Sequence, residues 1–157
     1  MGEKILRYQP SAISCIFARM TAGYSRRSLV DKLGIKPATR IALLQAPRGY
    51  RTTLGALPDG VKVATSARGS FPFIQYFVTR RSELERRFAT LKRGLEMDGS
   101  LWISWPKGQS GVRTDINENV VRDIALANGL VDVKVCAVDD VWSGLKLVRR
   151  LKDRTSR

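Results

Sequence analysis

The sequence predicts one α/β domain, a three-layer sandwich in which a mostly parallel β-sheet carries helices on both faces and ends in an antiparallel hairpin. Two observations predict it. Apolar runs typical of buried strands alternate with helical patterns, an order that requires right-handed crossovers between parallel strands. The chain has 157 residues of which 43% are hydrophobic, enough for a single domain with a substantial core.

The first half of the predicted domain holds one helix and two strands. The helix begins at Ser25 or Arg26 and carries an apolar face, and Gly34 fits the left-handed position that follows a helix. Strands are expected at 40–46 and, after the turn sequence LPDG, at 61–65. Between the two strands, the segment RTTLGAL fits one or two helical turns.

A third strand, FIQYFVT at 73–79, leads into the most strongly patterned helix of the chain. Its apolar side chains repeat at i, i+4, i+7 and i+11 from Leu84 to Leu95, and Ser82 with Glu85 forms a capping box. The dipeptide Asp98-Gly99 is then expected to turn the chain into a fourth strand, LWISW.

The last helix and the hairpin complete the predicted order. Asp115 and Glu118 form a second capping pair in front of a helix that runs to about Ala127. Two β-type runs follow, VDVKVCAV and WSGLKLVRR, and the acidic pair Asp139-Asp140 joins them as an antiparallel hairpin.

The ends of the chain differ from this domain. Residues 1–19 are expected to be a peripheral, poorly ordered extension, residues 20–150 the domain, and residues 151–157 a basic tail. The apolar patch in the leader is too short for a signal sequence, and no stretch reaches the length of a membrane-spanning helix. These features predict a cytoplasmic protein that contacts no membrane.

Charge and residue types limit the possible chemistry. A formal net charge of +14 favours an anionic partner through long-range attraction. The chain contains no histidine, which removes the commonest general base and metal ligand, and no metal site is expected. Of the two cysteines, Cys136 lies in an apolar run, where a small buried hydrophobe is favoured over a reactive thiol.

Three loops are expected at the carboxyl ends of the parallel strands, where α/β sheets bind ligands. They supply a candidate anion site made of Arg48, Gly49, Arg80, Lys107 and Ser110, because cations beside backbone amides suit a phosphate or carboxylate. The alternative is that these loop charges stay solvated. A Ser-Lys nucleophile from Lys107 and Ser110 is disfavoured, since a catalytic lysine must be buried.

The basic tail offers a second candidate surface. Arg149, Arg150, Lys152 and Arg154 form a nonspecific nucleic-acid contact in one interpretation and a solvated tail in the other. No motif for sequence-specific recognition accompanies them. An exposed Trp142 and the edge of the hairpin also make a homodimer possible, with packing of Trp142 on the last helix as the alternative.

The order of strand, capped helix, D-G turn, strand, helix and hairpin resembles the second half of class I methyltransferase-like Rossmann folds. In such enzymes the first strand is normally followed by an acid and a Gly-x-Gly turn, and the second strand ends in an acid that holds the ribose of the cofactor. Here the two strands end QAPRGY and VKVATSARG, and Pro47 removes one backbone donor. We therefore expect no cofactor.

Four quoted segments in combination resemble a family of small bacterial proteins classed as a domain of unknown function, family 3052. The segments are GYSRRSLVDKLGIKPATRIALL, FVTRRSELERR, DGSLWISWPKGQSGVRTDINENVVRDIAL and GLVDVKVCAVDDVWSGLKLVRR. The resemblance spans about Met20 to Arg150 and implies a compact Rossmann-like domain with no established activity. In the family's GYSG stretch the final glycine is replaced here by Arg26, which puts a ligand-approaching role of that turn in doubt.

Together these features favour a non-catalytic binding or regulatory module for an anionic small molecule. Two alternatives stay open. One is a divergent S-adenosylmethionine-dependent methyltransferase, and the other is nonspecific nucleic-acid binding through the basic surface and tail.

Overall fold

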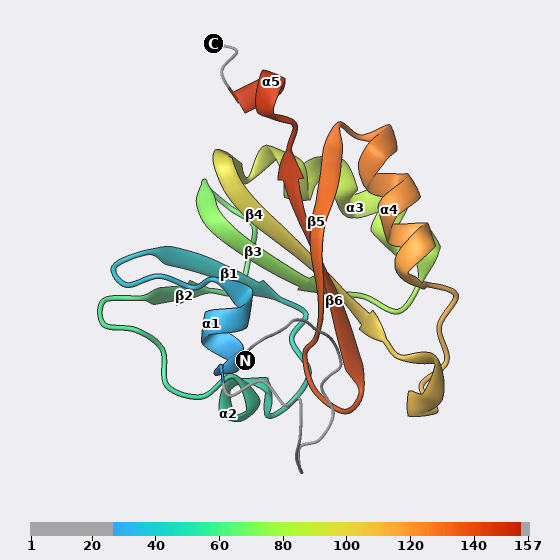
Figure 1. Cartoon of the computed structure of the whole chain (residues 1–157), viewed down its shortest axis with the longest axis horizontal. Helices are drawn as coiled ribbons and strands as arrows, with labels where there is room; N and C mark the ends of the chain where they lie inside the picture. Colours follow the sequence, from blue (N-terminus) through green and yellow to red (C-terminus); the bar gives the residue numbers. More distant parts are fainter. Residues whose placement is uncertain (1–26, 155–157) are drawn as a thin grey trace, which may run out of the picture.

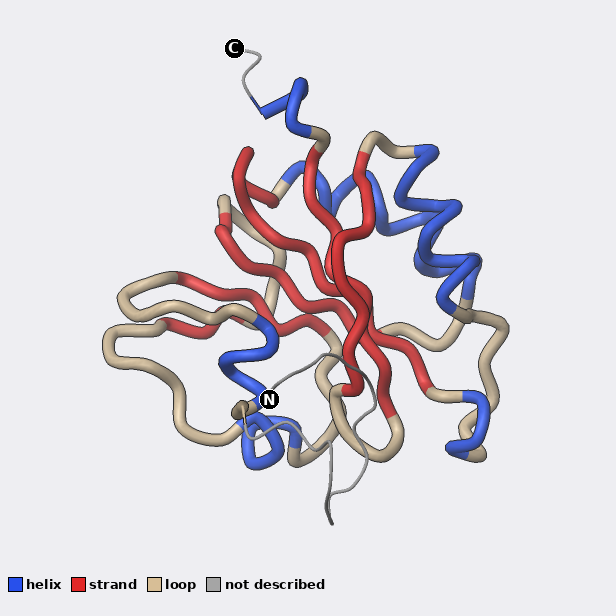
Figure 2. The backbone as a smooth tube through the Cα atoms, viewed as in Figure 1, coloured by secondary structure: helices blue, strands red, loops and turns tan. Residues whose placement is uncertain are grey.

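A single six-stranded sheet organises the chain, which we describe from a computed structural model over residues 27–154. The strand order is β2-β1-β3-β4-β6-β5 (Figures 1 and 2). Strands β1 to β4 are parallel, and the hairpin β5–β6 joins antiparallel to β4. The predicted fold class is confirmed. The predicted leader, 1–19, and the last residues of the predicted tail lie outside the described residues.

The elements follow the predicted order, with α2 in the segment that fitted one or two helical turns and a short helix at the end. Their bounds are α1 Leu29–Leu33, β1 Arg40–Leu44, α2 Tyr50–Leu54, β2 Lys62–Ala64, β3 Phe71–Phe77, α3 Arg81–Arg93, β4 Leu95–Pro106, the 3₁₀ turn η1 Gly108–Ser110, α4 Glu118–Ala127, β5 Leu130–Ala137, β6 Trp142–Arg149 and α5 Leu151–Arg154.

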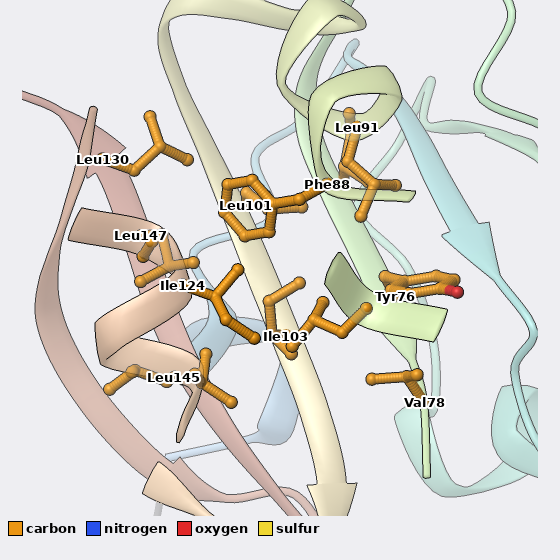
Figure 3. Packing of buried hydrophobic residues seen from close by; sticks show 14 of the residues in the cluster. Tyr76, Val78, Phe88, Leu91, Leu101, Ile103, Ile124, Leu130, Leu145 and Leu147 are labelled. Atoms are coloured by element: carbon orange, nitrogen blue, oxygen red, sulfur yellow. The ribbon is translucent and has the colours of Figure 1, made fainter. Parts of the chain in front are cut away.

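Each face of the sheet has its own apolar cluster. Helices α3 and α4 cover one face, where Phe88, Leu91 and Ile124 pack on Leu101 and Ile103 of β4 (Figure 3). The shorter helices α1 and α2 cover the other face, and their buried side chains pack around Trp102 of β4 and Phe73 and Phe77 of β3. The predicted apolar stripe of α3 is confirmed for Leu84, Phe88 and Leu91, which face the core, whereas Leu95 is the first residue of β4 and is buried there.

The first helix begins later than expected. The Ser28 side chain accepts a hydrogen bond from the Asp31 amide at 3.1 Å and caps α1, which starts at Leu29. Gly34 has a φ of 82°, as its predicted left-handed position after the helix requires.

Both predicted capping pairs are wrong, because the caps come from other residues. Helix α3 begins at Arg81, and its first amide donates to Oδ1 of Asp115 at 2.7 Å, across a sequence separation of 34 residues. Asn117, one position before α4, accepts from the Val120 amide at 2.9 Å and caps that helix. Asp115 thus ties the loop after β4 to the start of α3.

We expect Asp115→Ala to lower stability by about 1 kcal/mol, because it removes a carboxylate that caps a helix N-terminus. Thermal unfolding of the full chain measures this as a fall in Tm of roughly 2–4 °C for a domain of this size. Asp123→Ala is the control, since Asp123 is exposed on α4 and its carboxylate forms no hydrogen bond or ion pair with another residue of 27–154. Equal Tm values for the two variants would contradict the role of the cap.

The predicted turn at Asp98-Gly99 is instead a distortion within β4. Pairing of β3 with β4 jumps from Phe71↔Leu95 to Phe73↔Ser100, so four residues of β4 lie between these pairs where β3 has one. A Cβ at Gly99 would lie 2.9 Å from Leu95 Cδ1 and 3.0 Å from Pro72 O, so no other residue fits without a shift.

The terminal hairpin is confirmed. Oδ1 of Asp139 accepts hydrogen bonds from the amides of Val141 and Trp142, both at 2.8 Å, and closes the turn between β5 and β6. Trp142 is half-buried and packs edge-on against Phe77 at 5.1 Å between ring centroids. Both interpretations of Trp142 are therefore wrong. The side chain is not fully exposed, and it packs on Phe77 of β3 rather than on the last helix.

Two further properties concern the membrane and metals. In residues 27–154 no helix has the length and apolar character needed to span a bilayer. The same residues contain no group of histidine, cysteine or acidic side chains placed to hold a metal ion.

Candidate functional site

The strands β1 and β3 lie side by side, and their crossovers leave in opposite directions, β1 toward β2 and β3 toward β4. Ligands of α/β sheets bind outside the carboxyl ends of the strands at such a switch point. Gln45, directly after β1, adopts a φ of 56° and its Nε2 donates to the Phe77 carbonyl at 2.8 Å. This bond fixes the loop after β1 to the end of β3.

A chain of buried hydrogen bonds lies beneath this edge. The Tyr50 hydroxyl donates to Oε1 of Gln75 at 2.8 Å, and Nε2 of Gln75 donates to the Ser104 hydroxyl at 3.0 Å. Gln75 and Ser104 are fully buried in β3 and β4. Burial raises the pKa of Tyr50 well above its usual range, so the hydroxyl stays protonated and keeps its role as a donor.

Three aromatic side chains form a row over the same ends of the strands. Tyr50 meets Phe77 edge-on at 4.7 Å between ring centroids, and Phe77 meets Trp142 in the same geometry. Tyr50 and Phe77 are buried, whereas Trp142 is partly accessible. Cys136 is half-buried against the same cluster. Burial raises the pKa of its thiol, which favours a structural role, because a reactive cysteine needs a lowered pKa.

The loop after β1 contains two of the predicted anion-site residues. Arg48 is exposed, and Gly49 precedes α2 with a φ of 82°. A Cβ at Gly49 would meet nothing within 4 Å, so the backbone there is open on its outer side. In the described part of the chain, the amides of Arg48 and Gly49 form no hydrogen bond.

The other three predicted residues lie on the loops after β3 and β4. Arg80 is exposed at the start of α3, and Lys107 is half-buried just before η1. The Ser110 hydroxyl accepts from the Val112 amide at 3.2 Å and so stabilises its own loop. Within residues 27–154, no hydrogen bond joins these side chains to one another or to Arg48. The structure therefore places the loops of all five at one edge of the sheet, and within the described residues it shows no hydrogen bond that joins their side chains into one site.

The residues predicted for nucleic-acid contact lie at the opposite edge. The Arg149 guanidinium donates to the carbonyls of Leu95, Glu96 and Lys92 at 2.9 to 3.0 Å, so it has a structural role. Arg154 donates through Nε to the Arg149 carbonyl at 2.8 Å. Arg150 and Lys152 lie between them, at the end of β6 and on α5.

Sequence reasoning did not find Gln45, Tyr50, Gln75 or Ser104. The available signal was a single polar residue within each of two apolar runs, Gln75 in FIQYFVT and Ser104 in LWISW. Buried polar groups need partners, so two such residues on neighbouring strands indicate a shared hydrogen bond.

The methyltransferase-type positions for a cofactor have a mixed set of residues. β2 ends at Ala64 and is followed by exposed Thr65 and Ser66, which supply hydroxyls where an acid is normal. The loop after β1 supplies the Arg48 side chain and the amides of Arg48 and Gly49, which donate no hydrogen bond within the described residues. This set of groups suits the ribose hydroxyls and the free carboxylate of a nucleoside that carries an amino-acid group, and it differs from the usual set in having no acid.

Solved structures with a similar fold are methyltransferases. A SAM-dependent methyltransferase from Aquifex aeolicus has a TM-score of 0.55 and 17% identity, covering 76% of this chain and 86% of that chain. The ribosomal protein L11 methylase from Lactobacillus delbrueckii subsp. bulgaricus has a TM-score of 0.52 and 12% identity, covering 78% and 75%. A putative type 11 methyltransferase from Sulfolobus solfataricus has a TM-score of 0.52 and 13% identity, covering 78% and 89%.

No protein-family model and no curated protein matches the sequence, so the resemblance to family 3052 stays a prediction. The structural likeness shows a class I methyltransferase-like fold. The solved structures named above are methyltransferases, and this finding corrects the interpretation as a non-catalytic binding or regulatory module. The methyltransferase alternative accounts better for the fold.

Proposed function

We propose that the chain is a divergent S-adenosylmethionine-dependent methyltransferase. The observation that carries the proposal is the loop 45–49, which lies at the switch point between β1 and β3 of a methyltransferase-type sheet and has an open backbone. Likeness to solved methyltransferases over 76% to 78% of the chain supports it.

The residues that would hold the cofactor come from the loops after β1 and β2. The amides of Arg48 and Gly49, with the Arg48 guanidinium, suit the carboxylate of the methionine part, because charge-assisted bonds to a carboxylate are strong. Thr65 and Ser66 offer hydroxyls to the ribose. The bound cofactor would supply an electrophilic methyl group. The Gln45 bond to Phe77 would hold the loop in place while the ligand binds.

Titration of the full chain with S-adenosylmethionine and with S-adenosylhomocysteine tests the proposal. Ligand at 100 times its Kd should add about 2.7 kcal/mol to stability, a rise in Tm of roughly 5–10 °C for a domain of this size. Arg48→Ala should weaken binding by about 10- to 150-fold, since a hydrogen bond to a charged group contributes about 1.5–3 kcal/mol and about 1.4 kcal/mol is tenfold in affinity.

Arg51→Ala is the matched control, because Arg51 is an exposed arginine three positions further along, on α2. It should bind the cofactor like the unchanged chain. If neither compound raises the Tm at millimolar concentration, the proposal is wrong. Equal losses for the two variants would remove Arg48 from the site.

A further inference from the structure

The sheet edge opposite the candidate site carries a row of cations. At this edge β1, β2, β3 and β4 begin and β6 ends, and in Figure 1 it runs from the left, where β1 and β2 begin, to the top, where β6 leads into α5. We name the row the amino-edge strip. Its members are Arg40, Lys62, Arg68, Arg93, Arg150 and Arg154.

Contacts show that the first part of the strip is continuous. Arg40 and Lys62 are register partners at the starts of β1 and β2. The Arg40 guanidinium lies over the Phe71 ring at 4.6 Å and against Gly69, where a Cβ would be 3.5 Å from Nη2. Arg68 is the residue before Gly69, so three cations from β1, β2 and the following loop lie together.

The rest of the strip continues across β4 and β6. The end of α3 contacts the same loop, because a Cβ at Gly94 would lie 3.1 Å from the Ala67 carbonyl. Arg93 and Arg68, the residues next to Gly94 and Ala67, therefore lie on segments that touch. The Arg149 guanidinium joins the end of α3 to the end of β6, and Arg154 bonds the Arg149 carbonyl. The cations therefore follow one edge from β2 to α5.

Within the described residues, no ion pair neutralises the charges of the strip. In residues 27–154, the ion pairs seen are those of Arg81 and Arg122, and none involves a member of the strip. The acids of this edge, Glu96, Asp98 and Asp153, form no ion pair with it. A row of unpaired cations on a chain of net charge +14 attracts a polyanion.

We propose that the amino-edge strip binds the phosphate backbone of a nucleic acid. The strip crosses five neighbouring strands, from β2 to β6, a length of about 19 Å at the usual strand spacing of about 4.8 Å. That length matches about five or six phosphates at a rise of about 3.4 Å along one strand.

The side-chain types favour nucleic acid over a membrane surface. All members except Lys62 are arginines, whose planar fork binds phosphate through two hydrogen bonds. A membrane-surface helix needs an extended apolar face. Helix α5 has 4 residues and one exposed apolar side chain, Leu151. Backbone contacts carry no sequence information, so binding by the strip is nonspecific.

Fluorescence anisotropy with the full chain tests this proposal, using a labelled 20-nucleotide RNA strand and a 20-base-pair DNA duplex at several salt concentrations. Arg68→Gln/Arg93→Gln should weaken binding about tenfold. Loss of two phosphate contacts should reduce the slope of log K against log salt by about 1.4 for the single strand and about 1.8 for the duplex. Arg150→Gln/Arg154→Gln, at the other end, should act in the same direction.

Arg51→Gln/Arg113→Gln is the matched control, because it removes the same charge from exposed residues of α2 and the loop after β4. It should bind within about twofold of the unchanged chain. Binding to RNA or to DNA that depends on the strip supports the proposal. The nucleic acid that binds with the lower Kd is then the preferred partner. Equal losses for strip and control variants overturn it, as does binding only to vesicles of anionic phospholipid. Cofactor binding is measured separately, so its failure leaves this result unaffected.

Discussion

Replacing Trp102 by alanine should lower the free energy of unfolding by about 3–5 kcal/mol, the usual cost of truncating a fully buried large side chain. The Trp102 side chain is completely buried in β4, on the face that α1 and α2 cover. Its Nε1 donates to the Leu33 carbonyl at 3.0 Å and so attaches the end of α1 to the sheet. Gly144 makes room for the ring, because a Cβ there would lie 3.1 Å from Cε3.

Urea unfolding monitored by circular dichroism measures this cost. Trp102→Phe separates packing from hydrogen bonding, because phenylalanine keeps much of the ring volume and lacks the donor. It should cost about 1–3 kcal/mol, the penalty of leaving the buried Leu33 carbonyl without a partner. A loss under about 1 kcal/mol for Trp102→Ala would show that this face of the sheet contributes little to stability.

The sequence predicts the sheet and its two main helices because the spacing of apolar residues along these segments matches the residues that are buried. The apolar repeat of α3 and the β-branched and aromatic runs of β3 and β4 each identify one element without knowledge of its neighbours. The antiparallel hairpin is found for the same reason, since two β-type runs with a short polar turn between them are local in sequence.

Features that depend on a distant partner are missed. The cap of α3 is Asp115, 34 residues away, whereas a capping box can be recognised only within the helix's own first turn. The distortion at Asp98-Gly99 resembles a turn in the sequence because an aspartate followed by a glycine is typical both of a turn and of an irregular position within a strand. It becomes part of β4 only because Phe71 pairs with Leu95 across the sheet.

The candidate site divides in the same way. The position of its loops can be predicted, because parallel strands put their carboxyl ends at one edge, and Arg48, Arg80 and Lys107 each lie within four residues of a strand end. The buried hydrogen bonds beneath it cannot be predicted, since Gln75 pairs with Trp102 and comes within hydrogen-bond distance of Ser104, two positions further along β4, only in the register of β3 with β4.

Replacing Gln75 by alanine should destabilise the chain by about 3–5 kcal/mol, nearly as much as losing a core aromatic residue. Gln75 is both the acceptor for the Tyr50 hydroxyl and the donor to Ser104. Its loss leaves two buried polar groups without their partner, at about 1–3 kcal/mol each, and creates a cavity. Chemical unfolding of the variant beside the unchanged chain gives the difference.

Removing all three polar groups at once separates the cost of unpaired buried groups from the contribution of the hydrogen bonds themselves. The triple variant Tyr50→Phe/Gln75→Leu/Ser104→Ala replaces all three polar groups with apolar ones of similar shape, so no buried donor or acceptor stays unpaired. It should lie within about 2 kcal/mol of the unchanged chain and be more stable than Gln75→Ala alone. If the triple variant is the less stable of the two, the hydrogen bonds themselves hold the carboxyl ends of β3 and β4 together, and α2 depends on them for its position.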